Sequence, residues 1–289
     1  MKLHLLDGTY ELFRAYHGAA DSIQAPNGQE VGAVRGILET TFALLREQDV
    51  SHLGAATDHV IRSFRNDLWP DYKTEEGVPE DLLAQFPLAE RALETMGVLV
   101  WRMIEFEADD ALAAAAARHG DEVEQVVICT PDKDLAQCVV GTHIVQRDRM
   151  RRILYDEDGV RAKFGVPPES IPDWLALVGD SADGYPGLPG WGEKSATTML
   201  ARWGHLEAIP ADPAKWEIKV RGADRLAATL AAGQSEVMLF RRLATLRRDV
   251  PMTHALEDLR WKGVEREPWL AFCDEFGFER LKDRPHRWA

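Results

Sequence analysis

Short apolar runs that end near an acidic residue recur along the first half of the chain. Residues 3–6 lead into Asp7, residues 53–57 lead into Asp58, and residues 125–129 lead into a loop that contains Asp132 and Asp134. Each run has the length and composition of a buried strand, and residues 98–101 form another such run. The pattern therefore predicts several core strands with carboxylates at their carboxyl ends.

Segments with helical spacing separate these runs. Residues 32–47 have apolar residues at helical intervals, and residues 108–118 form an alanine-rich segment that opens with acids. Strands that alternate with helices are typical of an open, largely parallel α/β sheet. Ligands of such sheets bind outside the carboxyl ends of the strands, which is where the acids fall.

Two segments depart from this alternation. Residues 59–97 have the character of an insertion, with basic and aromatic residues followed by an amphipathic stretch over 82–96. Beyond about residue 165 the strand pattern fades, and short helical segments are separated by Gly and Pro. We expect a core at 1–165 with an insertion at about 59–97, and a helical region at 166–289, packed together as one compact unit.

Composition excludes several classes of protein. The 289 residues are 45% hydrophobic and 28% charged, which is typical of a globular chain. No run of about 18 uncharged apolar residues and no signal peptide are present, so we expect a cytoplasmic protein with no membrane partner. An odd number of cysteines without a C-x-x-C motif predicts buried thiols, and neither disulfides nor a zinc site: Cys129, Cys138 and Cys273.

The net charge of −14 does not exclude a nucleic-acid partner. Bound divalent cations invert the local field of an acidic site, while basic residues line another face. The distribution of charge therefore matters more than its sum.

Acids at the strand ends and in the glycine-rich loop of residues 179–194 form the main chemical feature of the sequence. There are nine of them: Asp7, Asp58, Glu107, Asp109, Asp110, Asp132, Asp134, Asp180 and Asp183. If they converge, their repulsion would raise their pKa values and destabilise the fold unless two or three Mg²⁺ or Mn²⁺ ions bind them. Two such ions suit the hydrolysis of a phosphodiester bond.

Each acid also has a plainer explanation. Taken by itself, Asp58 would be explained as a turn residue or a helix cap, and Asp132 and Asp134 could belong to a solvated loop. Glu107 and its two acidic neighbours could simply decorate a helix start. Their joint placement in one α/β topology favours metal ligation.

The glycine-rich loop leads directly into a helix predicted at residues 196–203. This is the form of a helix-hairpin-helix, expected at about 171–203, which holds a nucleic-acid backbone without reading its bases. A tight interhelical turn, with Gly as the only residue that fits, is the alternative.

Basic and aromatic side chains in the insertion would suit a single-stranded nucleic acid. They are Arg62, Arg65, Tyr72 and Lys73. Arg14, on the first predicted helix, could reach a phosphate. A solvated face for the insertion and an ordinary surface position for Arg14 remain the alternatives.

Residues 5–9 and the spacing of Gly179, Asp180 and Asp183 also partly resemble the haloacid-dehalogenase phosphatases. That superfamily needs an aspartate nucleophile two residues before the Asp-Gly-Thr acid, and Leu5 occupies this position. A leucine cannot attack a phosphate, so the sequence argues against this class.

Five ordered motifs resemble the 5′-nuclease family, which includes the 5′→3′ exonuclease domain of bacterial DNA polymerase I and the flap endonucleases. They are residues 6–8 with Arg14, Tyr16 and His17; Asp58 with 63–65 and 72–73; 107–110; 130–137; and 179–194. The resemblance is clear over about residues 1–205. It implies a PIN-like fold with a helical arch and a C-terminal helix-hairpin-helix region.

The resemblance also implies roles for individual residues. A first metal cluster would use Asp7, Asp58, Glu107, Asp109 and Asp132, and a second would use Asp134, Asp180 and Asp183, with Asp110 close by. Arg65 and Lys73 would project over the arch and take part in catalysis. Carbonyls near Gly187, Gly190 and Gly192 would hold a monovalent cation such as K⁺, and Lys194 and Ser195 would lie by the DNA backbone.

The family implies a structure-specific, metal-dependent DNA 5′-nuclease that hydrolyses phosphodiester bonds at 5′ flaps and 5′ ends during replication and repair. We expect a free-standing, monomeric, nucleoid-associated bacterial enzyme. A module that binds branched DNA without cutting, a phosphomonoesterase of the haloacid-dehalogenase type and a ribonuclease are the alternatives. Two departures stand out: Gly184 replaces the family's usual Asn, and Glu75 and Glu76 follow Lys73 where a basic residue is usual.

Overall fold

The computed structural model describes residues 1–18 and 22–289. The chain forms two compact units, each built from separate stretches of sequence. Unit 1 comprises Met1–Ile61, Glu75–Thr130 and Arg248–Ala289, and unit 2 comprises Arg62–Thr74 and Pro131–Arg247. The boundary expected near residue 165 lies inside unit 2, and the expected insertion at 59–97 is shared between the two units.

A parallel sheet forms the centre of unit 1. Its strands are β1 (Lys2–Asp7), β2 (His52–Asp58), β3 (Leu99–Met103) and β4 (Gln125–Cys129). β1 pairs with β2 on one side and with β4 on the other, and β2 pairs with β3, all in parallel. Because β1 and β2 are buried on both faces, they are continuous apolar runs. All four strands predicted from the sequence are confirmed.

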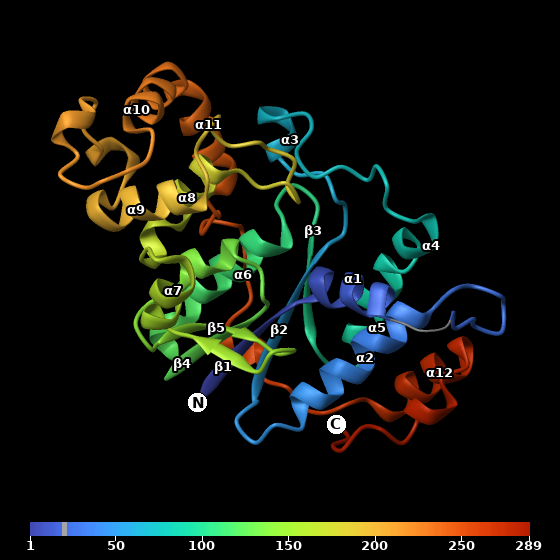
Figure 1. The fold of residues 1–289 in the computed structure, drawn as a ribbon. Helices are drawn as coiled ribbons and strands as arrows, with labels where there is room; N and C mark the ends of the chain where they lie inside the picture. Colours follow the sequence, from blue (N-terminus) through green and yellow to red (C-terminus); the bar gives the residue numbers. More distant parts are fainter. Residues whose placement is uncertain (19–21) are drawn as a thin grey trace. The chain divides into compact units, whose positions relative to one another are not determined.

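Helices cover this sheet. They are α1 (Gly8–Gly18), α2 (Gly32–Leu45), α4 (Glu80–Leu83), α5 (Phe86–Thr95), α6 (Ala108–His119) and α12 (Arg266–Phe276). Figure 1 shows α6 on one side of the sheet and α1, α2 and α5 on the other. The helices predicted at 32–47 and 108–118 are confirmed, and the stretch predicted at 82–96 is divided between α4 and α5.

Unit 2 is mainly helical. It contains α3 (Arg65–Leu68), α7 (Glu157–Phe164), α8 (Ile171–Val178), α9 (Glu193–Trp203), α10 (Ala223–Ala232) and α11 (Gln234–Ala244). Its apolar core includes the large side chains of Trp216, Tyr185 and Phe240. Two antiparallel strands, β5 (Ile144–Asp148) and β6 (Ile153–Tyr155), were not predicted.

The loop between α8 and α9 is tightly packed against the end of α8. Gly187 has a φ of +69°, and a Cβ atom there would lie 2.4 Å from the backbone nitrogen of Gly179. Only glycine fits this approach, which explains the glycine-rich sequence. The helix predicted at 196–203 is found as α9, which begins three residues earlier.

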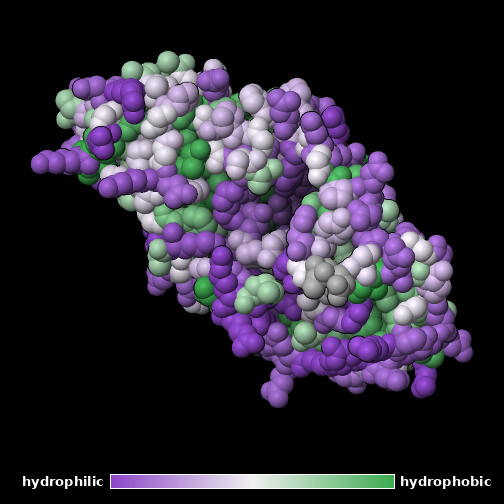
Figure 2. Space-filling model, turned by 45° about the vertical axis from the view of Figure 1, so that its right-hand side comes forward, coloured by the Kyte–Doolittle hydropathy of each residue, from purple (hydrophilic) through white to green (hydrophobic). Residues whose placement is uncertain are grey.

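Hydrophilic residues cover most of the face shown in Figure 2, and hydrophobic residues appear on it as small scattered patches. In the described ranges, no helix combines the length and apolar character needed to span a bilayer. The three cysteines are buried, as predicted.

Candidate functional site: two sets of buried carboxylates

The first set of carboxylates lies in unit 1 and is built into its secondary structure. Asp7 ends β1 and is 4% exposed. Its Oδ1 accepts a hydrogen bond from the Tyr10 N–H in the first turn of α1 at 2.8 Å, and its Oδ2 accepts one from the Thr130 hydroxyl at 2.8 Å. This carboxylate therefore joins β1, α1 and the residue after β4.

Asp58 plays a similar part at the end of β2. Its Oδ1 accepts a hydrogen bond from the Ala108 N–H at 2.7 Å, which ties the strand to the start of α6. At the same helix start, the Glu107 N–H donates to Asp110 Oδ2 at 3.1 Å, in a reciprocal capping box. Asp109 lies in the same first turn, and all these side chains are buried.

The second set of carboxylates lies in unit 2. Asp134, Asp180 and Asp183 each place a carboxylate oxygen within 4.8 Å of the other two, and all three side chains are buried. Among the described residues, Asp134 Oδ1 has no hydrogen-bond partner. Burial, together with the charges of Asp132, Asp183 and Asp180, raises the pKa of Asp134 well above its usual range. The ionised form of this set is therefore unfavourable without a cation.

Three side chains of unit 2 contact this second set. Lys133 Nζ lies 2.5 Å from Asp180 Oδ2, and Lys73 Nζ lies 3.5 Å from Asp183 Oδ1. The Tyr72 hydroxyl donates to Asp183 Oδ2 at 3.2 Å. Burial lowers the pKa of Lys133, but its hydrogen bond to Asp180 and the nearby acids outweigh this and raise it overall. Lys133 therefore remains a cation.

The donor set suits a hard divalent cation. It offers only oxygen ligands, three of them converge, and one oxygen of Asp134 lacks a partner within the described chain. Oxygen-rich sites of this kind select Mg²⁺ or Mn²⁺ over softer metals. The residues present therefore fit the metal that the sequence implies.

Asp132 lies beside the second set. Its Oδ1 accepts a hydrogen bond from the Asp134 N–H at 2.9 Å, and its carbonyl accepts one from the Gln146 amide. The resemblance grouped Asp132 with the acids of unit 1, whereas these contacts are all in unit 2. Asp110 was expected near the second set, and it accepts a hydrogen bond from the Glu107 N–H at the start of α6 in unit 1.

A hollow of about 560 Å³ opens next to the second set. Its walls include Lys133, Asp180, Ser181, Gly184, Tyr185 and Glu193, the first residue of α9. The N–H groups of a helix start attract anions, while the acids attract cations. One cavity of unit 2 thus borders both a cation site and an anion-binding helix end.

The expected role of Arg65 is wrong. Its side chain is fully buried and does not project into solvent. Nε donates to the Leu243 carbonyl at 2.7 Å, and Nη2 donates to the Thr245 carbonyl at 3.1 Å. The guanidinium satisfies the carbonyls at the end of α11, so it fixes the fold of unit 2 and is not available to DNA.

Tyr72 also differs from the expectation. Its ring is 2% exposed and stacks with Tyr185, with ring centres 6.4 Å apart. Its hydroxyl faces Asp183 and not a nucleic-acid path. Tyr72 therefore supports the acidic set from the core of unit 2.

The other basic residues of the prediction differ in exposure. Arg14 pairs with Glu11 on α1, through Nε at 3.1 Å and Nη2 at 2.5 Å. Arg62 is exposed, and Lys73 is partly exposed with a φ of +27°. Arg62 and Lys73 thus remain accessible to a ligand of unit 2.

The start of α9 presents exposed backbone and a lysine. Gly190, Gly192 and Lys194 are exposed, and Ser195 is partly so. The Gly192 N–H donates to Ser195 Oγ at 3.0 Å, and that hydroxyl donates back to the Gly192 carbonyl at 2.9 Å. Trp191 is buried under the loop and donates to the Leu226 carbonyl at 3.3 Å.

Two contributors to the second set, Lys133 and Tyr185, were not predicted. Lys133 lies between two predicted ligands, Asp132 and Asp134, and that position was the available signal. Tyr185 is buried, and no hydrogen bond of its hydroxyl is found within the described residues. Gly184 before it has a φ of +81°, and a Cβ there would lie 2.4 Å from the Asp71 carbonyl, so the family's usual Asn would not fit this loop.

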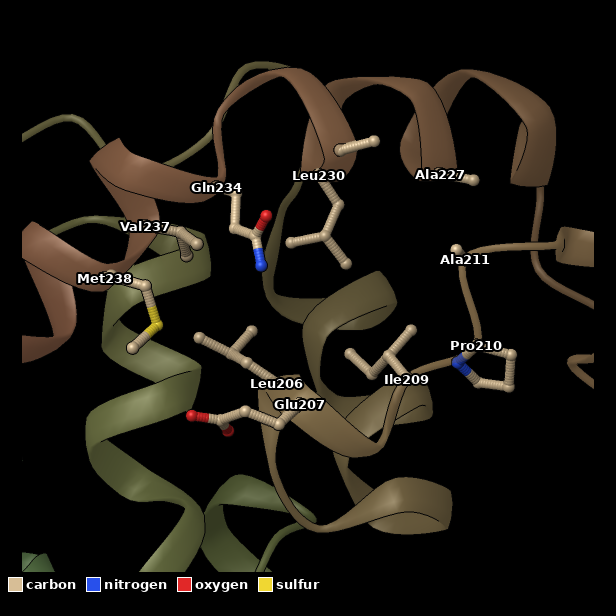
Figure 3. Close-up of a pocket in the computed structure, with 11 residues that line it drawn as sticks. Leu206, Glu207, Ile209, Pro210, Ala211, Ala227, Leu230, Gln234, Val237 and Met238 are labelled. Atoms are coloured by element: carbon tan, nitrogen blue, oxygen red, sulfur yellow. The ribbon is translucent and has the colours of Figure 1, made fainter.

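A separate hollow of unit 2 contains none of the predicted site residues. It measures about 230 Å³ and is lined mostly by aliphatic side chains. Figure 3 shows Leu206, Ile209 and Leu230 directed toward one another across it. Glu207 at its edge is paired with Arg241 at 2.6 Å, so the hollow offers little polar chemistry.

Two family models match the chain in succession. The model of the 5′-3′ exonuclease N-terminal resolvase-like domain matches residues 2–165, and that of the C-terminal SAM fold matches residues 166–267. The chain belongs to the 5′-3′ exonuclease family. This membership does not favour the haloacid-dehalogenase alternative.

Individual members of the 5′-3′ exonuclease family are similar along most of the chain. DNA polymerase I of Pseudomonas aeruginosa is 35% identical over 284 residues, which is 97% of this chain and 31% of the relative. The chain thus spans about a third of that polymerase. The 5′-3′ exonuclease of Aquifex aeolicus is 30% identical over 261 residues, 90% of this chain and 86% of the relative.

A solved structure shares the fold of this 5′-3′ exonuclease family member. It is a bacteriophage T5 flap endonuclease in a complex with DNA and metal ions. The TM-score is 0.67 at 17% sequence identity, and the match covers 84% of this chain and 89% of that one. The α/β core with a C-terminal helical region is therefore the architecture of a known nuclease structure.

Proposed function

We propose that the protein is a metal-dependent DNA 5′-nuclease that cuts 5′ flaps and degrades DNA from 5′ ends in replication and repair. The observation that carries the proposal is the buried trio Asp134, Asp180 and Asp183, whose oxygens converge and include one without a partner among the described residues. Membership of the 5′-3′ exonuclease family supports phosphodiester hydrolysis as the reaction at this trio. The bacteriophage T5 flap endonuclease, solved with DNA and metal ions, supports the same substrate.

Two or three Mg²⁺ or Mn²⁺ ions, when bound, would activate a water molecule and stabilise the leaving oxygen. In unit 2 the ligands would be Asp134, Asp180 and Asp183, with Asp132 beside them. In unit 1 they would be Asp7, Asp58, Glu107 and Asp109. Asp7 and Asp58 are held in place by hydrogen bonds from backbone N–H groups and from the Thr130 hydroxyl. Both sets are needed for turnover in this proposal.

The chain's own side chains orient the ligands of unit 2. Lys133 holds Asp180 by an ion pair, and the Tyr72 hydroxyl holds Asp183 by a hydrogen bond. Fixed carboxylates lose little freedom when a cation and a phosphate bind, which is the basis of preorganisation. Lys73, which lies 3.5 Å from Asp183, is the cation that a scissile phosphate would meet there.

The DNA backbone would bind at the start of α9. Gly192, Lys194 and Ser195 offer backbone N–H groups, a hydroxyl and an ammonium at an exposed helix start. Carbonyls near Gly187, Gly190 and Gly192 would hold a monovalent cation such as K⁺. These contacts carry no base identity, so they suit an enzyme that recognises DNA structure.

The test is cleavage of a 5′-end-labelled flap DNA in Mg²⁺, in Mn²⁺ and in EDTA, with an RNA flap in parallel. The Asp180→Asn variant is compared with the control Asp224→Asn, which removes an exposed acid at the start of α10. We expect metal-dependent product, lost by about a thousandfold or more in Asp180→Asn and unchanged in the control.

Cleavage in EDTA, or full activity in Asp180→Asn, would contradict the proposal. Tight flap binding without product in either metal would instead identify a branched-DNA-binding module. Preference for the RNA flap would identify a ribonuclease with the same metal site.

A further inference from the structure

The hairpin of β5 and β6 concentrates positive charge in an acidic chain. Four of the six residues from 147 to 152 are arginines, whereas the whole protein has a net charge of −14. The turn between the two strands carries Met150, Arg151 and Arg152, and Arg152 has a φ of +57°. The arginines are therefore gathered on one short, defined projection of unit 2.

The turn of this hairpin and its second strand, β6, are strongly exposed. The side chain of Arg151 is 71% exposed, and Met150 is 63% exposed. On β6, which is the last strand of its sheet, Leu154 is 52% exposed and Ile153 is 39% exposed. Apolar side chains and arginines therefore lie together on this surface. Such a surface suits a nucleic-acid strand, in which charged phosphates alternate with less polar sugars.

The hairpin is anchored to the second set of carboxylates. Buried Gln146 on β5 donates its amide to the carbonyl of Asp132, which in turn accepts from the Asp134 N–H through its carboxylate. At the carboxyl end of β5, buried Asp148 accepts a hydrogen bond from the Arg151 N–H at 2.9 Å and fixes the turn. The arginines thus follow a strand whose Gln146 contacts Asp132, beside the second set of carboxylates.

A lysine extends the basic surface next to β6. Lys163 Nζ lies 4.5 Å from the ring centre of Tyr155 on β6 and 4.8 Å from that of Phe164. A cation over an aromatic ring in this way is held in position while its charge remains available. The hairpin and α7 therefore present their cations together within unit 2.

We propose that the β5–β6 hairpin binds the phosphate backbone of the DNA that the second set of carboxylates cleaves, through Arg151 and Arg152. The inference rests on the proposed function. The buried acids of unit 2 repel phosphates, so a substrate held there needs cations along its path. Arginine forks match phosphate geometry without reading bases, which fits a structure-specific enzyme.

A protective role for the arginines is the competing explanation. Charged residues on an exposed edge strand prevent it from pairing with other chains. That role predicts aggregation when the charges are removed, and no change in DNA binding. The two explanations therefore differ in what is measured.

The experiment measures binding of a fluorescent flap DNA as a function of KCl concentration in Ca²⁺, with the DNA checked for cleavage afterwards. The Arg151→Gln/Arg152→Gln variant is compared with wild type and with Arg118→Gln/Arg280→Gln. The control removes two exposed arginines of unit 1 and the same net charge. Arg118 lies in the last turn of α6, at the opposite end from the acids.

We expect the slope of log affinity against log salt to fall in magnitude by about 1.8 in the hairpin variant, because each phosphate contact contributes about 0.9. The control should keep the wild-type slope, and Arg151→Lys/Arg152→Lys should restore most of it because the charge is retained. Thermal unfolding of all variants should coincide.

A hairpin variant with the same slope and affinity as the control would overturn the proposal, and aggregation with unchanged binding would assign the arginines to edge protection. Flap cleavage by the wild-type protein in Mg²⁺ is measured alongside. If the wild-type protein neither binds nor cuts the flap, the proposed function fails. If the wild-type protein cuts the flap and the hairpin variant binds it with the same slope and affinity as the control, only the hairpin proposal fails.

Discussion

The two sets of carboxylates are buried to a similar degree but are stabilised in opposite ways. In unit 1, Asp7 and Asp58 accept hydrogen bonds from the starts of α1 and α6, so their charges complete the helices. In unit 2, Asp134 is raised in pKa by burial and by its acidic neighbours, and one of its oxygens lacks a partner among the described residues. The first set is held by backbone hydrogen bonds of the fold, and the second has a geometry and charge that suit a cation.

This difference shows two ways in which one chain can carry buried acids. A buried carboxylate that accepts backbone hydrogen bonds contributes to stability, whereas one that faces other carboxylates costs free energy until a counter-ion binds. Removal of an acid should therefore have opposite effects on the metal-free stability of the two units.

The largest expected effect comes from Asp134→Asn. The substitution removes a ligand and should lower flap cleavage by about a thousandfold or more. It also removes the repulsion between the carboxylate of Asp134 and the neighbouring acids, so the free energy of unfolding in EDTA should rise. Cleavage and thermal unfolding of one preparation test both results, and a fall in metal-free stability would break the contrast between the sets.

Arg65→Met should destabilise the protein by about 3 kcal/mol. The guanidinium donates hydrogen bonds to the carbonyls of Leu243 and Thr245. In the variant these carbonyls lose that donor and face an apolar side chain. Denaturant unfolding measures the loss. Arg62→Met, at an exposed position nearby in sequence, is the control and should stay within about 0.5 kcal/mol of wild type.

Asp7→Ala should destabilise the metal-free protein by about 1–2 kcal/mol. The variant loses the hydrogen bond from the Tyr10 N–H at the start of α1 and the one from Thr130. Unfolding in EDTA is again the measurement. Equal or higher stability than wild type would show that repulsion also governs the first set.

The smallest expected effect is on the pH dependence of metal-free stability. The folded-state pKa of Asp134 is raised, so its ionised form destabilises the protein above that pKa. As pH falls through the raised pKa toward the unfolded value of about 4, this penalty is lost. The stability difference between Asp134→Asn and wild type should therefore shrink on acidification; a constant difference would contradict the assignment.

Sequence patterns predicted the strands of unit 1 well because parallel strands buried on both faces are continuous apolar runs. They failed for β5 and β6 because β5 is short and ends in the charged residues Arg147 and Asp148, and β6 has three residues and is largely exposed. Neither apolar length nor a Gly-containing turn marks these strands. Local pattern predicts structure where burial is complete, and loses it at an exposed edge.

The sequence predicted that three of the candidate acids lie together, but not which side chains contact them. The acids stand at strand ends, and the motifs of the family group Asp134, Asp180 and Asp183, which the structure brings together. Arg65 and Tyr72 were misjudged because their residue types are usually exposed, and only tertiary packing reveals that they are buried. Lys133 was missed because its partner, Asp180, is distant in sequence.

The interleaving of the two units has a consequence for how the chain is made. The backbone passes from one unit to the other four times, at residues 61–62, 74–75, 130–131 and 247–248. The last stretch of unit 1 begins at Arg248, so this stretch must leave the ribosome before unit 1 can be completed. Unit 2 has all its residues by Arg247 and can fold earlier, and neither unit can be cut out as a continuous fragment.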